Sequence, residues 1–272
     1  MRIRSFIAVV LLLTGGAGAA GCAFAFDHTH AGWNALVKRN VVVAANGNSS
    51  RVDYFAFKRD ERALDAYLNE LSAVTRSEFD GWSRDEKLAF LIDAYNAFTV
   101  KLVLTRYPGL RSIKELGSFL QTPWKLPFFT LFGTARTLDD VEHRMIRAPG
   151  AFDEPRIHFA LNCASLGCPM LREEAYVAAR LDAQLDSAVK RFLGDRNRNR
   201  FDPVSGRLEI SPIFDWYKTD FDKARDGGSV AQFLARYADF IADDAVGHAT
   251  VRRGNAPIRY LDYDWDLNDA TR

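Results

Sequence analysis

The sequence predicts an α+β fold, namely a helix-dominated single domain with a small β-sheet. Apolar residues recur at helical spacing in several long segments, whereas alternating apolar and polar residues are confined to short ones. No internal repeat and no low-complexity linker divides the sequence. Its 272 residues are enough to bury a full hydrophobic core without disulfide bonds.

The first 25 residues have the composition of an export signal peptide. Residues 1–5 are basic, residues 6–13 are apolar and the following residues are small. We expect cleavage near residues 21–25, either after Ala25 or before Cys22, which would then carry a lipid anchor. Ala25 is favoured because the third residue before Cys22 is Ala, where a lipobox usually has Leu. The mature protein is thus expected in the periplasm or cell envelope.

The charge balance gives no basis for nucleic-acid binding, since 36 basic residues face 35 acidic ones. No later segment is long and apolar enough to span a membrane, so we expect membrane contact only through an anchor on Cys22. After the signal peptide we expect an N-terminal extension over residues 26–50 and one domain over residues 51–272.

Two helices are predicted in the first half of this domain. The first follows a short extended segment at residues 51–57 and runs from Asp60 to about Thr75. The second begins with a capping box, Ser83 with Glu86, and ends before Pro108. It is apolar on nearly all sides and therefore buried.

Asp93 and Asn96 are polar residues on this buried helix and need partners there. They could tie down neighbouring loops. Alternatively, one of them could orient an imidazole as the third member of a catalytic set.

Aromatic residues over 119–132 predict part of the core or a wall around a site, with any exposed remainder forming a binding patch. A capped helix then starts at Thr137 and carries Glu142 and His143, which we expect to be a solvated pair. The remaining predicted elements are a helix at 181–193, a hairpin at 201–210, an aromatic plug at 214–221, an amphipathic helix at 230–241 and a closing strand at 258–265.

The strongest chemical signal is at residues 156–169. An apolar run from Ile157 to Leu161 predicts a strand that carries His158 into a small-residue turn between Cys163 and Cys168. Thiols and imidazoles are the side chains most easily tuned to act as nucleophile and base near neutral pH. A buried structural histidine and a disulfide are the corresponding non-catalytic interpretations.

The first functional hypothesis is a thiol hydrolase or acyl transferase, with Cys163 as nucleophile and amides of the small-residue turn binding the oxyanion. In a regular strand His158 and Cys163 would face opposite sides, so His158 can be the base only if the chain turns before Cys163. Otherwise His143 is the expected base. Cys168 is the alternative nucleophile if a helix begins at Pro169.

Three other hypotheses remain open. Cys163 and Cys168 could form a disulfide, although their C-x4-C spacing differs from that of thioredoxin-like proteins. The two cysteines with His143 and His158 could bind zinc, although their spacing matches no usual zinc pattern. Finally, the aromatic residues 119–132 could make a non-catalytic envelope binding protein.

Several motifs together resemble the DUF547 family. They are Val52-Asp53-Tyr54, Leu91-Ile92-Asp93-Ala94-Tyr95-Asn96-Ala97, Thr137-Leu138-Asp139-Asp140-Val141-Glu142-His143 with Arg147, His158-Phe159-Ala160-Leu161, Cys163-Ala164-Ser165, Cys168-Pro169, Phe214 with Trp216-Tyr217 and Phe221, and Tyr263-Asp264-Trp265 with Leu267-Asn268. The resemblance extends from about Val52 to Asn268.

The resemblance implies a single domain and marks a set of candidate site residues: Asn96, Glu142, His143, His158, Cys163 and Cys168. It also hints at thiol chemistry, because plant and animal relatives can be joined to glutaredoxin-like modules. The family has no settled function, so the substrate stays open, with a peptide, amide or thioester expected. No cofactor or metal is expected.

Overall fold

The computed structural model describes residues 25–222 and 228–272. The predicted signal peptide lies almost wholly outside these residues, and its processing stays a prediction. Within the described residues the predicted fold class is confirmed, because helices dominate and the strands form small sheets.

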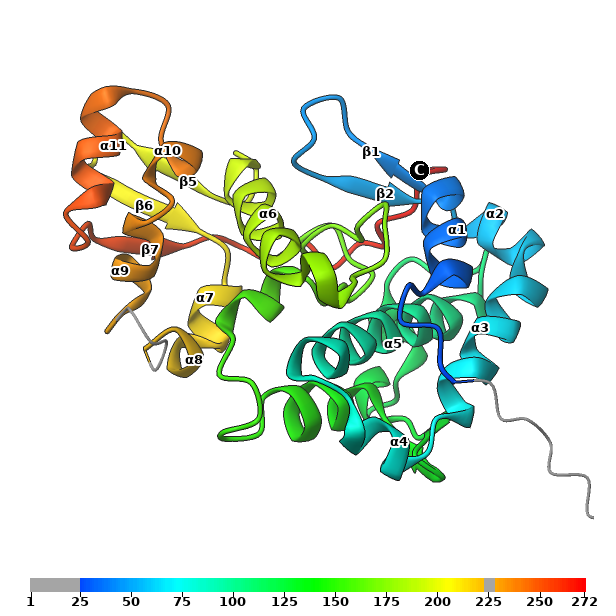
Figure 1. Cartoon of the computed structure of the whole chain (residues 1–272). Coiled ribbons are helices and arrows are strands. Elements are labelled where there is room, and N and C mark those ends of the chain that lie inside the picture. Colours follow the sequence, from blue (N-terminus) through cyan, green and yellow to red (C-terminus); the bar gives the residue numbers. More distant parts are fainter. Residues whose placement is uncertain (1–24, 223–227) are drawn as a thin grey trace, which may run out of the picture.

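The first part of the molecule is a group of helices with one short hairpin (Figure 1). Its elements are α1 (Ala31–Asn40), β1 (Val41–Val43), β2 (Ser50–Val52), α2 (Tyr54–Arg59), α3 (Glu61–Ala73), α4 (Arg76–Gly81) and α5 (Arg84–Leu104). Trp33 and Leu36 of α1 are buried in the same core as α5. The segment expected as an N-terminal extension therefore packs on the domain.

α5 is the central helix, and it begins as predicted. The Ser83 hydroxyl accepts a hydrogen bond from Glu86 N–H, and the Glu86 carboxylate accepts one from Ser83 N–H at 2.8 Å. Side chains on nearly every side of the helix are buried, from Leu88 to Leu104. The core of the first part is consequently built around α5.

Short elements connect α5 to the next long helix. They are the 3₁₀ helices η1 (Ile113–Leu116) and η2 (Pro123–Lys125), the antiparallel hairpin of β3 (Phe129–Leu131) and β4 (Thr134–Arg136), the π-helix η3 (Asp140–Ile146), and the 3₁₀ helices η4 (Pro155–Phe159) and η5 (Ala178–Arg180). Thr137 and Asp140 exchange hydrogen bonds at the start of η3, as expected for a cap. The helix itself is π rather than α, because Arg147 N–H donates to Glu142 O, five residues earlier, at 2.9 Å.

The second part contains a three-stranded sheet covered by short helices (Figure 1). α6 (Leu181–Gly194) leads into it, and β6 (Arg207–Ile210) lies between the antiparallel β5 (Arg200–Asp202) and the parallel β7 (Ile258–Tyr260). The covering helices are α7 (Ile213–Trp216), α8 (Lys218–Asp222), α9 (Val230–Ala235), α10 (Ala238–Ile241) and α11 (Ala245–Arg252). The predicted helix at 181–193 and hairpin at 201–210 are confirmed, whereas the predicted helix at 230–241 is two short helices.

The strand predicted at residues 157–161 is wrong. This segment is largely the 3₁₀ helix η4, with Pro155 in its first turn and the Glu154 carboxylate accepting a hydrogen bond from Arg156 N–H. An apolar run of five residues fits a buried helical turn as well as a buried strand. Here Pro155 and its cap decide for the helix.

The C-terminal segment connects the two parts. The predicted strand at 258–265 is limited to β7, after which the chain runs back to the first part (Figure 1). There Val52 N–H donates to Asn268 O at 2.8 Å, and the Tyr54 hydroxyl donates to Asn268 Oδ1 at 2.7 Å. Among the helices of residues 25–222 and 228–272, none is long and apolar enough to cross a membrane.

Candidate functional site

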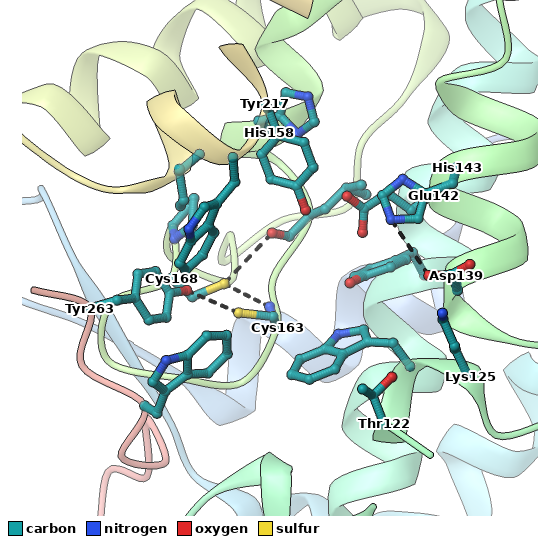
Figure 2. A pocket seen from close by; sticks show the side chains of 17 residues that line it. Thr122, Lys125, Asp139, Glu142, His143, His158, Cys163, Cys168, Tyr217 and Tyr263 are labelled. Atoms are coloured by element: carbon teal, nitrogen blue, oxygen red, sulfur yellow. Dashed lines mark hydrogen bonds and ion pairs between the residues drawn. The ribbon is translucent and has the colours of Figure 1, made fainter. Parts of the chain in front are cut away.

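A cavity of about 340 Å³ lies where the two parts meet (Figure 2). Its walls carry six aromatic rings, those of Tyr95, Trp124, Trp216, Tyr217, Tyr263 and Trp265. Five of the six predicted site residues also line it, namely Glu142, His143, His158, Cys163 and Cys168. Cys163 and Tyr263 lie on one side, and Glu142, His143 and Asp139 lie on the other.

Asn96 does not line the cavity but holds the loop that carries Cys163. Its side-chain amide donates to Ala160 O at 3.0 Å, and its Oδ1 accepts from Asn162 N–H at 2.8 Å. Asp93, one turn earlier, accepts from Tyr176 N–H at 3.2 Å. Both side chains therefore tie down loops, and neither contacts His143 or His158 among the interactions of the described residues.

The turn after Cys163 is held in an unusual backbone conformation. Ala164 has a φ of 62°, and its N–H donates to the Asn162 side chain at 3.0 Å. Strained backbone of this kind is concentrated at functional sites. A Cβ on Gly167 would lie 3.0 Å from the backbone of Asp264, so this close approach of the C-terminal segment favours glycine.

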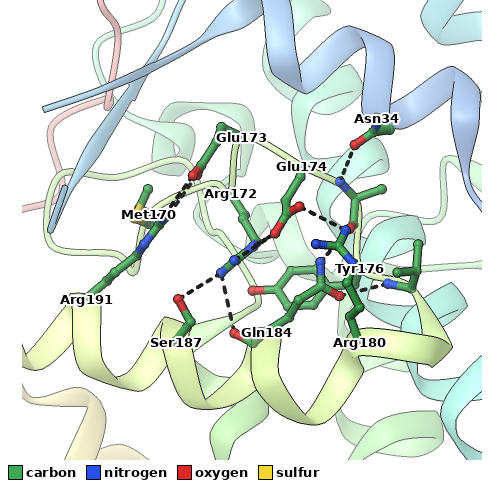
Figure 3. Close-up of polar contacts among 12 residues, drawn as sticks. Asn34, Met170, Arg172, Glu173, Glu174, Tyr176, Arg180, Gln184, Ser187 and Arg191 are labelled. Carbon is green, nitrogen blue, oxygen red and sulfur yellow. Dashed lines mark hydrogen bonds and ion pairs between the residues drawn. The ribbon is translucent and has the colours of Figure 1, made fainter.

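The segment after Cys168 is fixed on α6 (Figure 3). Arg191 forms an ion pair with Glu173 at 2.8 Å, and the Gln184 side chain donates to Ala175 O at 2.8 Å. The buried Arg198 side chain donates a hydrogen bond to Cys168 O. No helix begins at Pro169, because the next helical element is η5 at Ala178, so the condition for Cys168 as the alternative nucleophile is not met.

Cys163 has the surroundings of a stabilised thiolate. Its Sγ lies 3.2 Å from the Tyr263 hydroxyl and 3.3 Å from the Ser165 hydroxyl, and Ser165 also donates to Tyr263 at 3.1 Å. Burial opposes ionisation, but the polar Cys168, Ser165 and Tyr263 side chains beside the sulfur outweigh it and lower the pKa of the Cys163 thiol.

Cys168 has the opposite character. Its Sγ accepts a hydrogen bond from Cys163 N–H at 2.7 Å, and its thiol donates to Leu161 O at 3.8 Å. Burial, followed by the neighbouring Cys163, raises the pKa of Cys168 well above its ordinary value. Both cysteines are free thiols in the structure. Cys163 is accordingly the more easily ionised thiol of the two.

His158 is engaged away from Cys163. Its Nε2 pairs with Asp220 at 2.8 Å, and its ring stacks on Tyr217 with centroids 3.8 Å apart. Burial lowers the pKa of His158. Asp220 is shared with Arg147, whose Nε lies 2.6 Å away. His158 thus supports the Tyr217 wall of the cavity.

Glu142 and His143 project from η3. The expectation of a solvated pair is wrong for Glu142, which is 6 % exposed and lies beside the Tyr217 hydroxyl. The π-helical turn changes which side chains face inward and directs Glu142 to the cavity. His143 is partly exposed; its Nε2 lies 3.6 Å from Asp139, and its Nδ1 contacts Arg147.

The oxyanion site expected from the small-residue turn is not formed by most of its amides. Ala164, Leu166 and Gly167 N–H donate to Asn162, Asp266 and Asp264. Cys168 N–H donates to Ser165 O. Cys163 N–H differs from these, because its acceptor is a thiol sulfur, which is a weak one.

The alternative of a zinc site finds no support in the described residues. Within residues 25–222 and 228–272, His, Cys, Asp and Glu side chains form no group of three or more that could hold a metal ion. His158 and His143 are instead bound to Asp220 and Arg147.

Comparison with known families agrees with the site motifs. Residues 79–193 match the family model described as "Protein of unknown function, DUF547". This segment is therefore similar to the DUF547 family, as its motifs suggest. Neither a curated protein nor a solved structure matches the chain.

The matched segment supplies most of the cavity lining but not all of it. It contains α5, Glu142, His143 and both thiols, whereas Tyr217, Tyr263 and the supporting Asp220 lie beyond it. Ser165, Tyr263 and Asp220 are site residues that were not predicted from the sequence. Tyr263 belongs to an alternating segment and to one of the family motifs, but neither indicates that its hydroxyl meets Cys163.

The Tyr263 hydroxyl provides a direct test of the thiolate environment. In Tyr263→Phe the aromatic ring is kept but one donor to Sγ is lost, so the pKa of Cys163 should rise. At a pH below the Cys163 pKa of both the wild type and the variant, alkylation of Cys163 by iodoacetamide should then slow by about tenfold, the effect of one pKa unit. The pH profile measured by peptide mass spectrometry checks this, with equal rates expected above both pKa values. An unchanged profile would show that Tyr263 does not stabilise the thiolate.

Proposed function

We propose that this protein is a cysteine-dependent hydrolase or acyl transferase with Cys163 as its nucleophile. The observation that carries the proposal is the Cys163 thiol, with its lowered pKa and three hydrogen-bonding neighbours, on the wall of an aromatic cavity. A thiolate that is already stabilised needs no histidine in contact with it before attack.

The chemistry assigned to the cavity is acyl transfer. The Cys163 thiolate attacks a carbonyl carbon, and the carbon–sulfur bond forms as the carbonyl π electrons move to oxygen. The Cys163 N–H turns from the weakly accepting Cys168 sulfur to this oxyanion. Collapse expels the leaving group with a proton and leaves a thioester, which water or another acceptor then cleaves.

His143 is the proposed proton carrier for both steps. It lines the same cavity, and its side chain is 37 % exposed, so it can exchange protons with solvent. Its contact with Asp139 orients the ring. Asn96 and His158 are positioning residues in this proposal, the first for the Cys163 loop and the second for Tyr217.

The proposal is tested by trapping the acyl-enzyme. Purified protein is mixed with p-nitrophenyl acetate, a short acyl thioester and a peptide anilide, and intact mass is recorded over time. An acyl adduct on Cys163 that forms and decays supports the proposal. The absence of adduct and turnover with all three compounds, in protein whose Cys163 is reduced, would argue against it.

A non-catalytic binding protein is the second candidate, and the exposed tip of the segment 119–132 favours it. Phe119 and Leu120 are almost fully exposed beside the cavity residues Thr122 and Trp124. This candidate predicts that function in vivo survives Cys163→Ser but is lost in Phe119→Ser with Leu120→Ser.

Export is part of the proposal, with the mature protein in the periplasm or cell envelope. The basic, apolar and small segments of residues 1–25 support it. Cell fractionation with N-terminal sequencing tests it, because export predicts a mature chain that begins at Cys22 or Phe26.

A further inference from the structure

Glu142 is a buried carboxylate that forms no close ion pair in the described part of the chain. It is 6 % exposed and lines the cavity. None of the ion pairs found among residues 25–222 and 228–272 includes it. Its close polar neighbour is the neutral Tyr217 hydroxyl. Burying a carboxylate without a counter-ion costs several kcal/mol, so such a group is usually completed by a partner.

The nearby basic side chains form no close ion pair with Glu142 in the described part of the chain. Arg147 is held by Asp220 at 2.6 Å, and its guanidinium lies over the Tyr217 ring. His143 contacts Asp139 and Arg147. Lys125 lines the cavity but is exposed to solvent, which screens its charge. Arg147 therefore attracts Glu142 without forming an ion pair with it, which leaves the carboxylate able to pair with a cation of a bound molecule.

The cavity walls suit a cation as well. Aromatic faces attract ammonium groups, most strongly where water is excluded. The protein already uses this attraction at two wall rings: Lys114 Nζ lies 3.7 Å from the centroid of Trp265, and Arg147 lies 4.7 Å from that of Tyr217. Tyr95 and Trp124 add further rings to the same space.

We propose that the cavity binds the ammonium group of its substrate between Glu142 and the aromatic walls, with the acyl carbon placed on Cys163. The substrate class is an ester, thioester or amide of a small acyl group that carries an amine. This inference rests on the proposed function for the acyl carbon, but the cation site stands on Glu142 and the rings alone.

Binding of the cation would also affect the thiol. The negative charge of Glu142 acts against the Cys163 thiolate and so limits the lowering of the Cys163 pKa. An ammonium group beside Glu142 cancels this effect, so the correct substrate makes its own nucleophile more reactive.

The test uses methanethiosulfonates that differ only in charge. Each transfers its thioalkyl group to the thiolate, forming a mixed disulfide and releasing methanesulfinate. We compare the 2-(trimethylammonio)ethyl and 2-sulfonatoethyl reagents and map the products at Cys163 by mass. The rate of each reagent with Cys163 is divided by its rate with free 2-mercaptoethanol. We expect this relative rate to be higher for the cationic reagent than for the anionic one. The ratio of the two relative rates should fall by about tenfold in Glu142→Gln. Glu142→Asp should keep most of it.

Asp139→Asn is the matched control, since Asp139 lies on the same wall but is partly exposed and contacts His143. Its effect on the ratio should be clearly smaller. Equal rates for both reagents in the wild type, or a preference that survives Glu142→Gln, would overturn the inference.

A second measurement needs neither a reactive thiol nor a variant protein. Benzylamine and benzyl alcohol are titrated into the wild-type protein, and tryptophan fluorescence reports binding beside Trp124. Tighter binding of benzylamine supports the cation site, and equal or weaker binding contradicts it. An unreactive Cys163 would instead contradict the proposed nucleophile.

Discussion

Cys163→Ser will abolish the acyl-enzyme and reduce turnover by about a thousandfold or more, because a serine hydroxyl without a contacting base is a poor nucleophile. The matched variant is Cys168→Ser. A hydroxyl at position 168 can still accept the hydrogen bond from Cys163 N–H, so a loss of only about tenfold is expected.

Intact mass and initial rates with the best substrate of the acyl panel measure both effects. Equal losses in the two variants would mean that the thiols act as a pair rather than as nucleophile and neighbour. Full activity of Cys163→Ser would exclude Cys163 as nucleophile.

Asn96→Ala should lower the free energy of unfolding by about 2–4 kcal/mol, because it leaves Ala160 O and Asn162 N–H buried without partners. The Asn96 hydrogen bonds to these two groups fix the loop that carries Cys163. The Cys163 thiol of the variant should therefore also lose its reactivity toward iodoacetamide at low pH. Urea unfolding and the pH profile of alkylation measure the two effects.

Thr99→Val is the control on the same buried helix. The Thr99 hydroxyl donates to Tyr95 O, which is within α5 and away from the Cys163 loop. We expect a loss of about 1 kcal/mol or less and an unchanged pH profile. Equal effects in both variants would show that Asn96 matters only for packing of α5.

The helices of the first part could be predicted because their signals are local. The capping box of Ser83 and Glu86 and the apolar surface of α5 lie within one segment, and both are found as predicted. Residues 157–161 were misassigned because a five-residue apolar run has no period of its own. Pro155 was the local signal that could have indicated a helical turn.

The site could be predicted only where its residues share a motif. Cys163 and Cys168 stand on one turn, and Glu142 and His143 are adjacent, so the sequence suggests them directly. Tyr263 reaches Cys163 across 100 residues, and Asp220 reaches His158 across 62. Such partners depend on how the C-terminal segment and α8 pack, which no local pattern contains.

The burial of Glu142 was not predicted either, although its cause lies within one short segment. An α-helical pattern placed this residue on or beside the solvated face. The π-helix η3 shifts the register by one residue and brings the carboxylate into the cavity. A pattern based on α-helical spacing cannot anticipate this shift.

Alkylation of the unreduced native protein tests the central claim most directly. The protein is treated near neutral pH with limiting iodoacetamide, with and without prior reduction, and adducts are mapped by mass. We predict rapid modification of Cys163 and slow modification of Cys168, with the same result in both samples. Two thiols that are blocked until reduction would establish a Cys163–Cys168 disulfide and contradict the assignment of Cys163 as a free nucleophile.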